Sequence, residues 1–302
     1  MTELVVRRLL VDLETPFPRR WAGGDAFRSA FFNALSMSFP VGEQFFIDAV
    51  REGARALPPE QAARFEAEVR GFVGQEATHR RVHALYNAQL ERQGFVNDWG
   101  PRAGARMGVI AGADPRHALA ATAANEHFTA LLAHHLLERP AALAGAEPRL
   151  ATLWRWHAAE ESEHRSTAFD LYRALGGNEA WRRRWMRRVT LLLLADSLRQ
   201  TADNLKRDGA LWRPSTWFSA ARFFFGWHGL VTRTLLPWLA YFRADFHPSH
   251  QDDAAARRWL AAHPNAWRPV QPPANASGQG ASASVAEAAG PDANRAMTAR
   301  PA

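Results

Sequence analysis

The chain has 302 residues, of which 47% are hydrophobic and 22% are charged, enough to bury the core of one large or two ordinary domains. It contains 12 His and no Cys, which excludes disulfide scaffolds, thiolate zinc sites, iron–sulfur clusters and cysteine nucleophiles. A metal would have to be bound by His, Asp and Glu. The net charge is +7, and because all but one of the 37 basic residues are Arg, we attribute it to base composition rather than to a partner.

Residues 1–25 are predicted to form an N-terminal arm that packs on the body of the protein. Prolines and glycines between Thr15 and Asp25 break any regular element there. Charged residues at Glu3, Arg7 and Arg8 interrupt the apolar stretch that a signal peptide needs. We therefore expect a cytoplasmic protein.

Four helical segments are predicted between residues 26 and 177, where apolar residues recur at three- and four-residue steps and no run alternates with period two. Asp25 caps the first segment, which Pro40 interrupts or kinks. Pro58 opens the second, and Asp114 with Pro115 opens the third. The four segments span residues 26–57, 58–93, 114–139 and 148–175. These features predict an all-α fold with a four-helix bundle over residues 26–177.

Residues 178–265 are predicted to add helices that pack on the bundle. A fifth helix covers 178–207, and an aromatic block rich in Trp and Phe follows at 212–246. Neither offers the roughly 20 uninterrupted apolar residues that a bilayer span needs. From about residue 270 the chain lacks large apolar side chains, and residues 266–302 are expected to form a disordered tail.

A repeated pattern of acidic residues and histidines runs along the four predicted helices. Glu76 follows Glu43 by 33 residues and Glu161 follows Glu126 by 35, and both later glutamates begin a Glu-x-x-His. Residues i and i+3 share a helix face, so each Glu-x-x-His directs a carboxylate and an imidazole to one point in a bundle core. Together, four carboxylates and two imidazoles can hold two divalent metals, which would offset the repulsion among buried carboxylates. The six candidates are Glu43, Glu76, His79, Glu126, Glu161 and His164.

This constellation resembles the ferritin-like di-iron and di-manganese carboxylate proteins. The wider sequence resembles a bacterial family of predicted metal-dependent hydrolases over roughly residues 1–260. The segments that carry this likeness are FFNALSMSFPVGEQFF (31–46), FVGQEATHRRVH (72–83), NEHFTALLA (125–133), LWRWHAAEESEHRSTAFD (153–170) and YFRADFHPSHQD (241–252). The resemblance implies a ferritin-like four-helix bundle, the six candidates as ligands, and two divalent metal ions, with Fe favoured over Mn, mixed Mn/Fe or Zn.

His157 extends the motif of the fourth helix to His-x-x-x-Glu-x-x-His. This is similar to the motif of di-iron arylamine N-oxygenases, in which the extra histidine is a ligand. His157 is therefore either a third histidine ligand or a hydrogen-bonding neighbour of the ligands. Further residues that could orient ligands through hydrogen bonds are His83, Asp170 and Gln75. The candidate catalytic residues are Glu76, Glu161 and His157.

Two other carboxylates compete with Glu161. Glu160 lies four residues before His164, at the edge of the same helix face, whereas Glu163 points about 100° away and is expected to be solvated or paired with an Arg. Only Glu161 lies three residues before His164. The remaining histidines of the bundle, His127, His134 and His135, are expected to be structural or exposed.

The leading functional hypothesis is a di-iron enzyme that uses dioxygen to oxidise or oxygenate a small apolar organic substrate, because a carboxylate-rich site without thiolates suits iron or manganese. The alternatives are hydrolysis by a metal-activated water and iron binding or storage. The electron donor is left open, and no nucleic acid partner is expected.

Two surfaces suggest partners besides the substrate. The segment Trp181–Arg188 is either a peripheral membrane contact or a solvated basic helix face. The aromatic block at 212–246 is either core or homodimer interface, or an apolar tunnel to the metals.

Overall fold

The computed structural model describes residues 4–110 and 112–270, and within them the fold is all-α, as predicted. The helices are α1 (Ala26–Arg55), α2 (Pro59–Arg92), α3 (Trp99–Ile110), α4 (Pro115–Glu138), α5 (Pro148–His164), α6 (Thr167–Ala174), α7 (Glu179–Arg207), α8 (Pro214–Phe225), α9 (Leu230–Ala240) and α10 (Ala254–Ala262). Three short 3-10 helices, η1 (Pro140–Leu143), η2 (Pro248–His250) and η3 (Pro264–Ala266), complete the helical elements. No helix of the described residues is long and apolar enough to cross a membrane.

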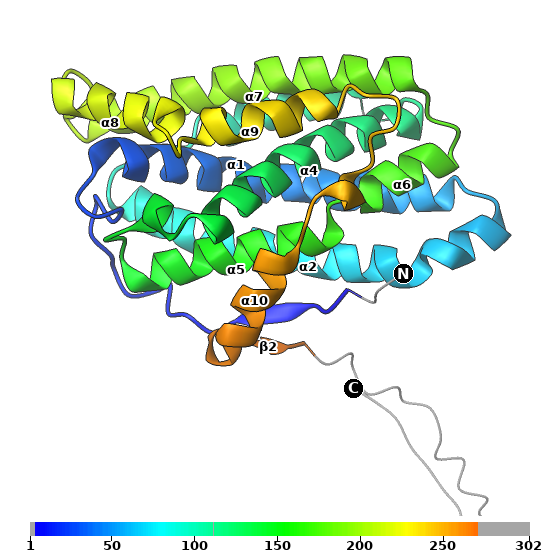
Figure 1. The fold of residues 1–302 in the computed structure, drawn as a ribbon, viewed down its shortest axis with the longest axis horizontal. Coiled ribbons are helices and arrows are strands. Elements are labelled where there is room, and N and C mark those ends of the chain that lie inside the picture. The colour runs from blue at the N-terminus through cyan, green and yellow to red at the C-terminus, as the bar shows by residue number, and fades with distance from the viewer. Residues whose placement is uncertain (1–3, 111, 271–302) are drawn as a thin grey trace, which may run out of the picture. The chain divides into compact units, whose positions relative to one another are not determined.

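The helices stack in three layers (Figure 1). α1 and α4 form the middle layer, with α2 and α5 on one side and α7, α8 and α9 on the other. Two buried apolar clusters lie along these helices, one containing Phe32 and Trp154 and the other Phe46 and Leu119. Polar residues occupy the space between the clusters, where α1, α2, α4 and α5 meet.

α1 continues through Pro40 without interruption, so the expected break is absent. Proline has no N–H, and Pro40 therefore leaves the carbonyl of Ser36 without its usual helical donor. The side chain of Asn87 on α2 supplies one, with Nδ2 donating to Ser36 O at 2.9 Å. The Ser36 hydroxyl donates back to Asn87 Oδ1 at 2.8 Å. This exchange fixes α1 to α2 about two turns before Glu43.

The predicted fourth helix, 148–175, is two helices. α5 ends at His164 and α6 begins at Thr167. At the break, the buried Arg165 side chain donates to Pro248 O at 3.1 Å and to Gln251 O at 2.7 Å. Hydrogen bonds to the distant η2 segment therefore stabilise a turn that local periodicity does not reveal.

α3 was not among the predicted helices. Its sequence contains Pro101 and three glycines, which are poor helix formers. The helix is stabilised by α7 instead: Gln200 Oε1 accepts the backbone N–H groups of Asp98 and Trp99, and Asp196 pairs with Arg102 at 3.1 Å. Tertiary contacts thus override the weak local propensity.

The two ends of the described chain pair with each other. β1 (Arg7–Leu9) in the arm and β2 (Trp267–Pro269) form an antiparallel two-stranded sheet, with Leu9 opposite Trp267. Residues 266–270 are therefore ordered, and the predicted tail was placed too early at its start. The rest of that prediction, residues 271–302, lies outside the described residues.

Candidate metal centre

The six predicted ligand residues converge where α1, α2, α4 and α5 meet, and none of them is more than 4% exposed. One group of potential ligand atoms comes from Glu76, Glu126, Glu161 and His164, which lie within 4.8 Å of one another. A second group comes from Glu43, Glu76 and His79, within the same limit. Two further groups contain His157, one with Glu43 and His83 and one with His79 and Glu161. The groups overlap, so the same side chains could hold one or more cations.

The hydrogen bonding of these side chains fits such ions. Buried polar atoms in proteins nearly always have a partner, yet nine atoms here have none among the described residues. They are both carboxylate oxygens of Glu43, Glu76 and Glu126, Oε2 of Glu161, Nδ1 of His79 and Nε2 of His164. All are electron-pair donors of the types that bind divalent iron, manganese or zinc. The donor set therefore suits a pair of divalent cations.

The electrostatics lead to the same conclusion. Burial, with added repulsion from Glu76, raises the pKa of Glu43 well above its ordinary value. Burial together with the charge of Glu161 does the same to the pKa of Glu126. Added positive charge would favour the ionised form of both carboxylates. Two bound cations would keep them ionised.

His79 is oriented by a hydrogen bond on the side facing away from the cluster. Its Nε2 donates to Glu160 Oε2 at 2.9 Å, while Nδ1 lies 3.4 Å from Glu161 Oε1. Burial acts to lower the pKa of His79, but the adjacent carboxylates of Glu160 and Glu161 raise it to about 10. Glu160 therefore hydrogen-bonds the His79 nitrogen that faces away from the cluster, as a carboxylate that orients a metal-binding histidine does.

His164 is held in the same manner by Gln75. Its Nδ1 donates to Gln75 Oε1 at 2.8 Å, and Nε2 lies 3.1 Å from Glu76 Oε1. Gln75 Nε2 in turn donates to Glu163 Oε2 at 2.8 Å. Each imidazole thus presents one nitrogen to the cluster and uses the other for a hydrogen bond.

The N-terminal arm closes both networks through Arg7. Its guanidinium donates to Glu160 at 3.2 Å and to both oxygens of Glu163 at 2.7 and 2.8 Å. Pairing of Glu163 with an Arg was predicted, but Arg7 was not identified as its partner. The only sequence signal is that Arg7 and Leu9, two residues apart, both face the body of the protein in β1. This strand is too short to be recognised without its partner strand.

A family model described as a predicted metal-dependent hydrolase matches residues 5–252. The chain belongs to this family. The resemblance predicted from the sequence is thereby confirmed. No curated protein and no solved structure matches the chain. The matched range contains every residue of the cluster and Arg7, so the whole network lies within the part that defines a predicted metal-dependent hydrolase.

His157 borders the cluster in this predicted metal-dependent hydrolase. Its Nε2 lies 2.7 Å from Glu161 Oε1 and 3.9 Å from Glu43 Oε1. Its Nδ1 lies 2.7 Å from His83 Nε2, and His83 Nδ1 lies 2.8 Å from the Ser36 hydroxyl. Burial lowers the pKa of His157 to about 4, which favours the neutral imidazole that metals bind. His83 uses both ring nitrogens in this chain and orients His157.

The other predicted residues lie away from the cluster. The Asp170 carboxylate lies 2.7 Å from His247 Nε2. Within the described residues it makes no hydrogen bond to the cluster. His127 and His135 are buried and His134 is exposed. Within the basic segment, Arg182 is fully buried and Trp185 is 8% exposed, while Trp181 stacks on His117. These three side chains are thus used by the fold, which leaves Arg184, Arg187 and Arg188 exposed.

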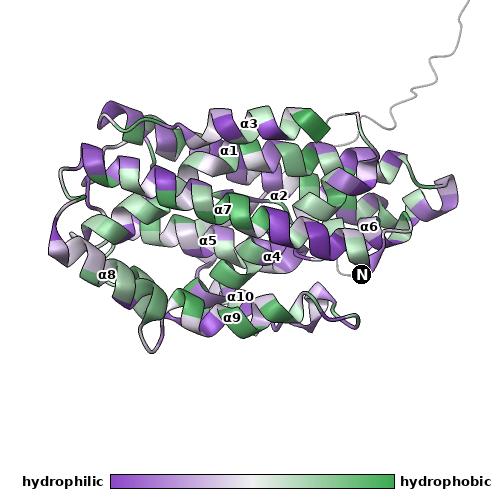
Figure 2. Cartoon of the chain, turned by 90° about the horizontal axis from the view of Figure 1, so that it is seen from above, coloured by the Kyte–Doolittle hydropathy of each residue, from purple (hydrophilic) through white to green (hydrophobic). Residues whose placement is uncertain are grey.

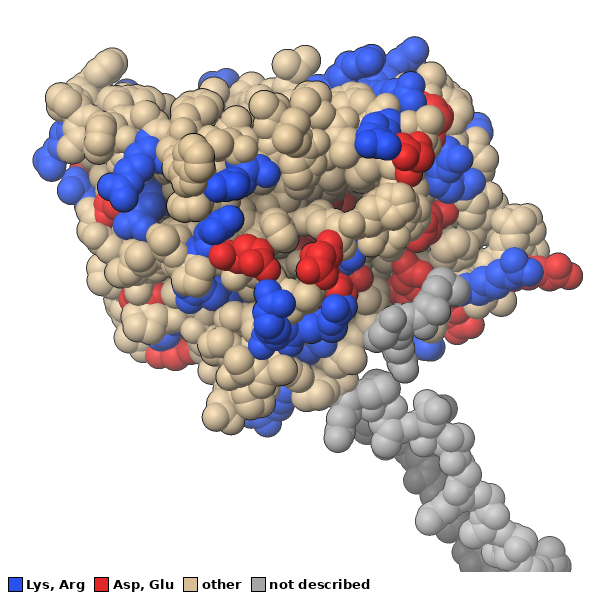
Figure 3. Space-filling model, in the orientation of Figure 1, with Lys and Arg blue, Asp and Glu red and all other residues tan. Residues whose placement is uncertain are grey.

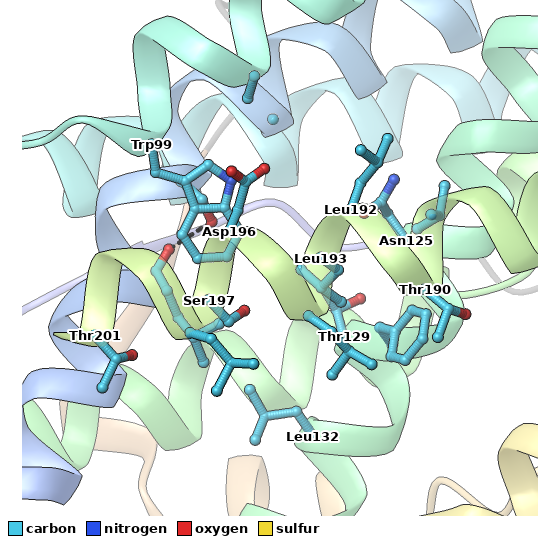
Figure 4. A pocket seen from close by; sticks show the side chains of 18 of the residues that line it. Trp99, Asn125, Thr129, Leu132, Thr190, Leu192, Leu193, Asp196, Ser197 and Thr201 are labelled. Atoms are coloured by element: carbon cyan, nitrogen blue, oxygen red, sulfur yellow. Dashed lines mark hydrogen bonds between the residues drawn. The ribbon is translucent and has the colours of Figure 1, made fainter. Parts of the chain in front are cut away.

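Two cavities lie near the cluster, and only the smaller one is lined by residues that belong to it or border it. A large one of about 760 Å³ lies between α1, α3, α4, α7, α8 and α9 and is lined mostly by apolar side chains (Figure 4). A small one of about 20 Å³ reaches His157 and Glu161. Phe39, Thr129 and Leu132 line both cavities. These three residues therefore separate the apolar cavity from the cluster.

Proposed function

We propose that the chain is a di-metal carboxylate enzyme that uses dioxygen to oxidise or oxygenate an apolar organic substrate. The proposed ligands of its two ions, with iron favoured, are Glu43, Glu76, His79, Glu126, Glu161 and His164, and His157 is a further candidate ligand. The observation that carries the proposal is the set of nine unpartnered donor atoms beside an apolar cavity. When bound, the metal pair would supply electrons to dioxygen.

The surroundings of the cluster support oxidation over hydrolysis. The residues between the cluster and the large cavity are mainly apolar, and the Thr129 hydroxyl is engaged within α4, donating to Glu126 O at 3.0 Å. Cleavage of an ester or phosphoester benefits from hydrogen-bond donors aimed at the developing charge. Oxidation of an apolar group needs instead a site that excludes water, which the rings of Phe39 and Trp154 beside His83 favour.

The protein's own residues position the reaction. Glu160 and Gln75 fix the two imidazoles, and Arg7 holds Glu160 and Glu163 in place. The hydrogen-bonded line from His157 through His83 to Ser36 holds the His157 ring beside Glu161. These groups would hold the site rigid while the carboxylates change how they bind the metals.

A second candidate is hydrolysis, which the family description favours. In that case a bound metal would activate a water for attack on a carbonyl or phosphoryl group, and no oxygen would be consumed.

Oxygen consumption decides between the two candidates. Metal-depleted protein is reconstituted anaerobically with Fe(II), exposed to oxygen, and followed with an oxygen electrode and by optical absorption. We expect oxygen uptake and new absorption that require Glu76 and are lost in Glu76→Ala. Turnover of ester or phosphoester substrates under strict anaerobiosis, without oxygen uptake in air, would replace our proposal with the hydrolytic one.

A further inference from the structure

The large cavity opens to the surface between α7, α8 and α9. Leu192, Trp217 and Leu235 line it and are also 37%, 49% and 48% exposed, so the same side chains face both the cavity and solvent. Figure 2 shows α8 and α9 as largely hydrophobic helices at the edge of the molecule. A ligand that enters here would transfer apolar surface from water to an apolar cavity, which is favourable.

At its inner end the cavity is lined by Phe39, which packs against two histidines that border the cluster. The Phe39 ring packs 4.5 Å from the His83 ring and 4.8 Å from the His157 ring, measured between centroids. Gly42, which directly precedes Glu43, also lines the cavity, and a Cβ at this position would meet only the Phe46 ring, at 3.9 Å. The lack of a side chain at Gly42 therefore leaves open space in the cavity along α1.

Positive charge borders the cavity. Arg188 lines it, is exposed, and stacks over the Trp185 ring at 5.2 Å, with no carboxylate partner in the described part of the chain. Arg106 lines it as well, but shares Asp196 with Arg102. The sequence has no Asp or Glu between residues 209 and 244. In Figure 3 the surface over α8 and α9 is accordingly tan with scattered blue.

We propose that this cavity binds a long-chain carboxylate, an unbranched aliphatic chain with an anionic head group. The head pairs with Arg188 at the surface, and the chain extends along the leucines of α7 toward Phe39 beside the cluster. A guanidinium without a carboxylate partner suits a carboxylate head, and the apolar lining suits a hydrocarbon chain. The inference deepens the proposed function by naming its substrate class. Binding of the carboxylate does not depend on that function, and only the oxidation of its aliphatic chain rests on it.

Isothermal titration calorimetry of the full-length protein with dodecanoate, octanoate and dodecan-1-ol tests the proposal. Each buried methylene is worth about 0.8 kcal/mol, or roughly a fourfold change in affinity. We expect one binding site, with dodecanoate at least tenfold tighter than octanoate and at least fivefold tighter than dodecan-1-ol. Absence of saturable dodecanoate binding, or equal affinity for the acid and the alcohol, would overturn it.

Matched variants locate the site. Arg188→Gln should weaken dodecanoate binding at least fivefold and dodecan-1-ol binding less than twofold. Arg184→Gln, which removes an exposed Arg of the same helix that does not line the cavity, should change neither. Equal effects of the two Arg variants would contradict the head-group assignment.

The position of the ligand's aliphatic chain is tested by substitutions that fill the cavity. Gly42→Leu should weaken both long-chain ligands at least tenfold, whereas Gly108→Leu, at an exposed position of α3 outside the lining, should leave both unchanged. Unchanged binding in Gly42→Leu would show that the chain does not reach the cluster. Because titration needs neither metal nor turnover, these results are independent of whether the proposed oxidation occurs.

Discussion

At the scale of single residues, the most informative contact is the one between His79 and Glu160. Glu160 is fully buried, and a carboxylate in that setting must be balanced by hydrogen bonds or charge. Here His79 and Arg7 provide that balance. The same contact fixes which nitrogen of His79 faces the cluster. We therefore expect the loss of this contact to lower metal affinity.

We predict that Glu160→Ala lowers metal affinity about 10- to 100-fold, the usual effect of removing a group that orients a ligand histidine. Glu160→Gln keeps an oxygen that accepts from His79 and should restore most of the affinity. The measurement is a competition titration with a chelator of known affinity. Unchanged metal affinity in Glu160→Ala would contradict the proposal that Glu160 orients His79 for metal binding.

A second prediction concerns His157. Its Nε2 faces Glu161 and Glu43 while His83 holds its Nδ1, which is the arrangement of a histidine that binds a metal. We expect His157→Ala to lose about half of the bound metal and to change the optical spectrum of the Fe(II) protein after exposure to air. Full metal content with an unchanged spectrum would make His157 a hydrogen-bonding neighbour only.

At the scale of elements, α1 and α2 depend on each other at Pro40. The carbonyl that Pro40 leaves without a donor is bonded by Asn87, and an unsatisfied buried carbonyl costs about 1–3 kcal/mol. Asn87→Ala should therefore lower the free energy of unfolding by about 2 kcal/mol.

The cause is tested by a double-mutant cycle in chemical denaturation. Pro40→Ala restores an N–H that can donate to Ser36 O, so part of the loss caused by Asn87→Ala should be recovered in the double variant. Strictly additive effects of the two substitutions would contradict this explanation.

The sequence predicts those parts of the fold and site that depend on local spacing. Glu76 and His79, three residues apart on one helix, share a face wherever the helix lies, and the same holds for Glu161 and His164. The caps at Asp25 and Asp114 are equally local, and both side chains accept the expected backbone N–H.

What the sequence does not predict depends on distant partners. α3 is stabilised by Gln200 and Asp196, and the turn after His164 by carbonyls more than 80 residues away. The role of Glu160 is of the same kind. From helix spacing alone it competes with Glu161, and only the position of His79 on α2 shows that it hydrogen-bonds a proposed ligand instead.

At the scale of the whole described molecule, the middle layer of α1 and α4 divides two environments. On one side lies the carboxylate cluster, and on the other the apolar cavity beneath α7, α8 and α9. The first four predicted helices thus account for the carboxylate cluster, while the C-terminal helices complete the cavity. The arm and the pairing of β1 with β2 bring Arg7 to the outer side of the cluster.

The central claim is that the cluster holds two metal ions, and elemental analysis of the purified protein tests it most directly. We predict about two divalent ions per chain in the wild type. Glu76→Ala should lose most of this metal while helical circular dichroism largely survives. Its control on the same helix is Glu66→Ala, whose side chain is 75% exposed and which should keep both ions. A wild-type protein without stoichiometric metal after reconstitution, or a Glu76→Ala variant with full metal content, would contradict the account.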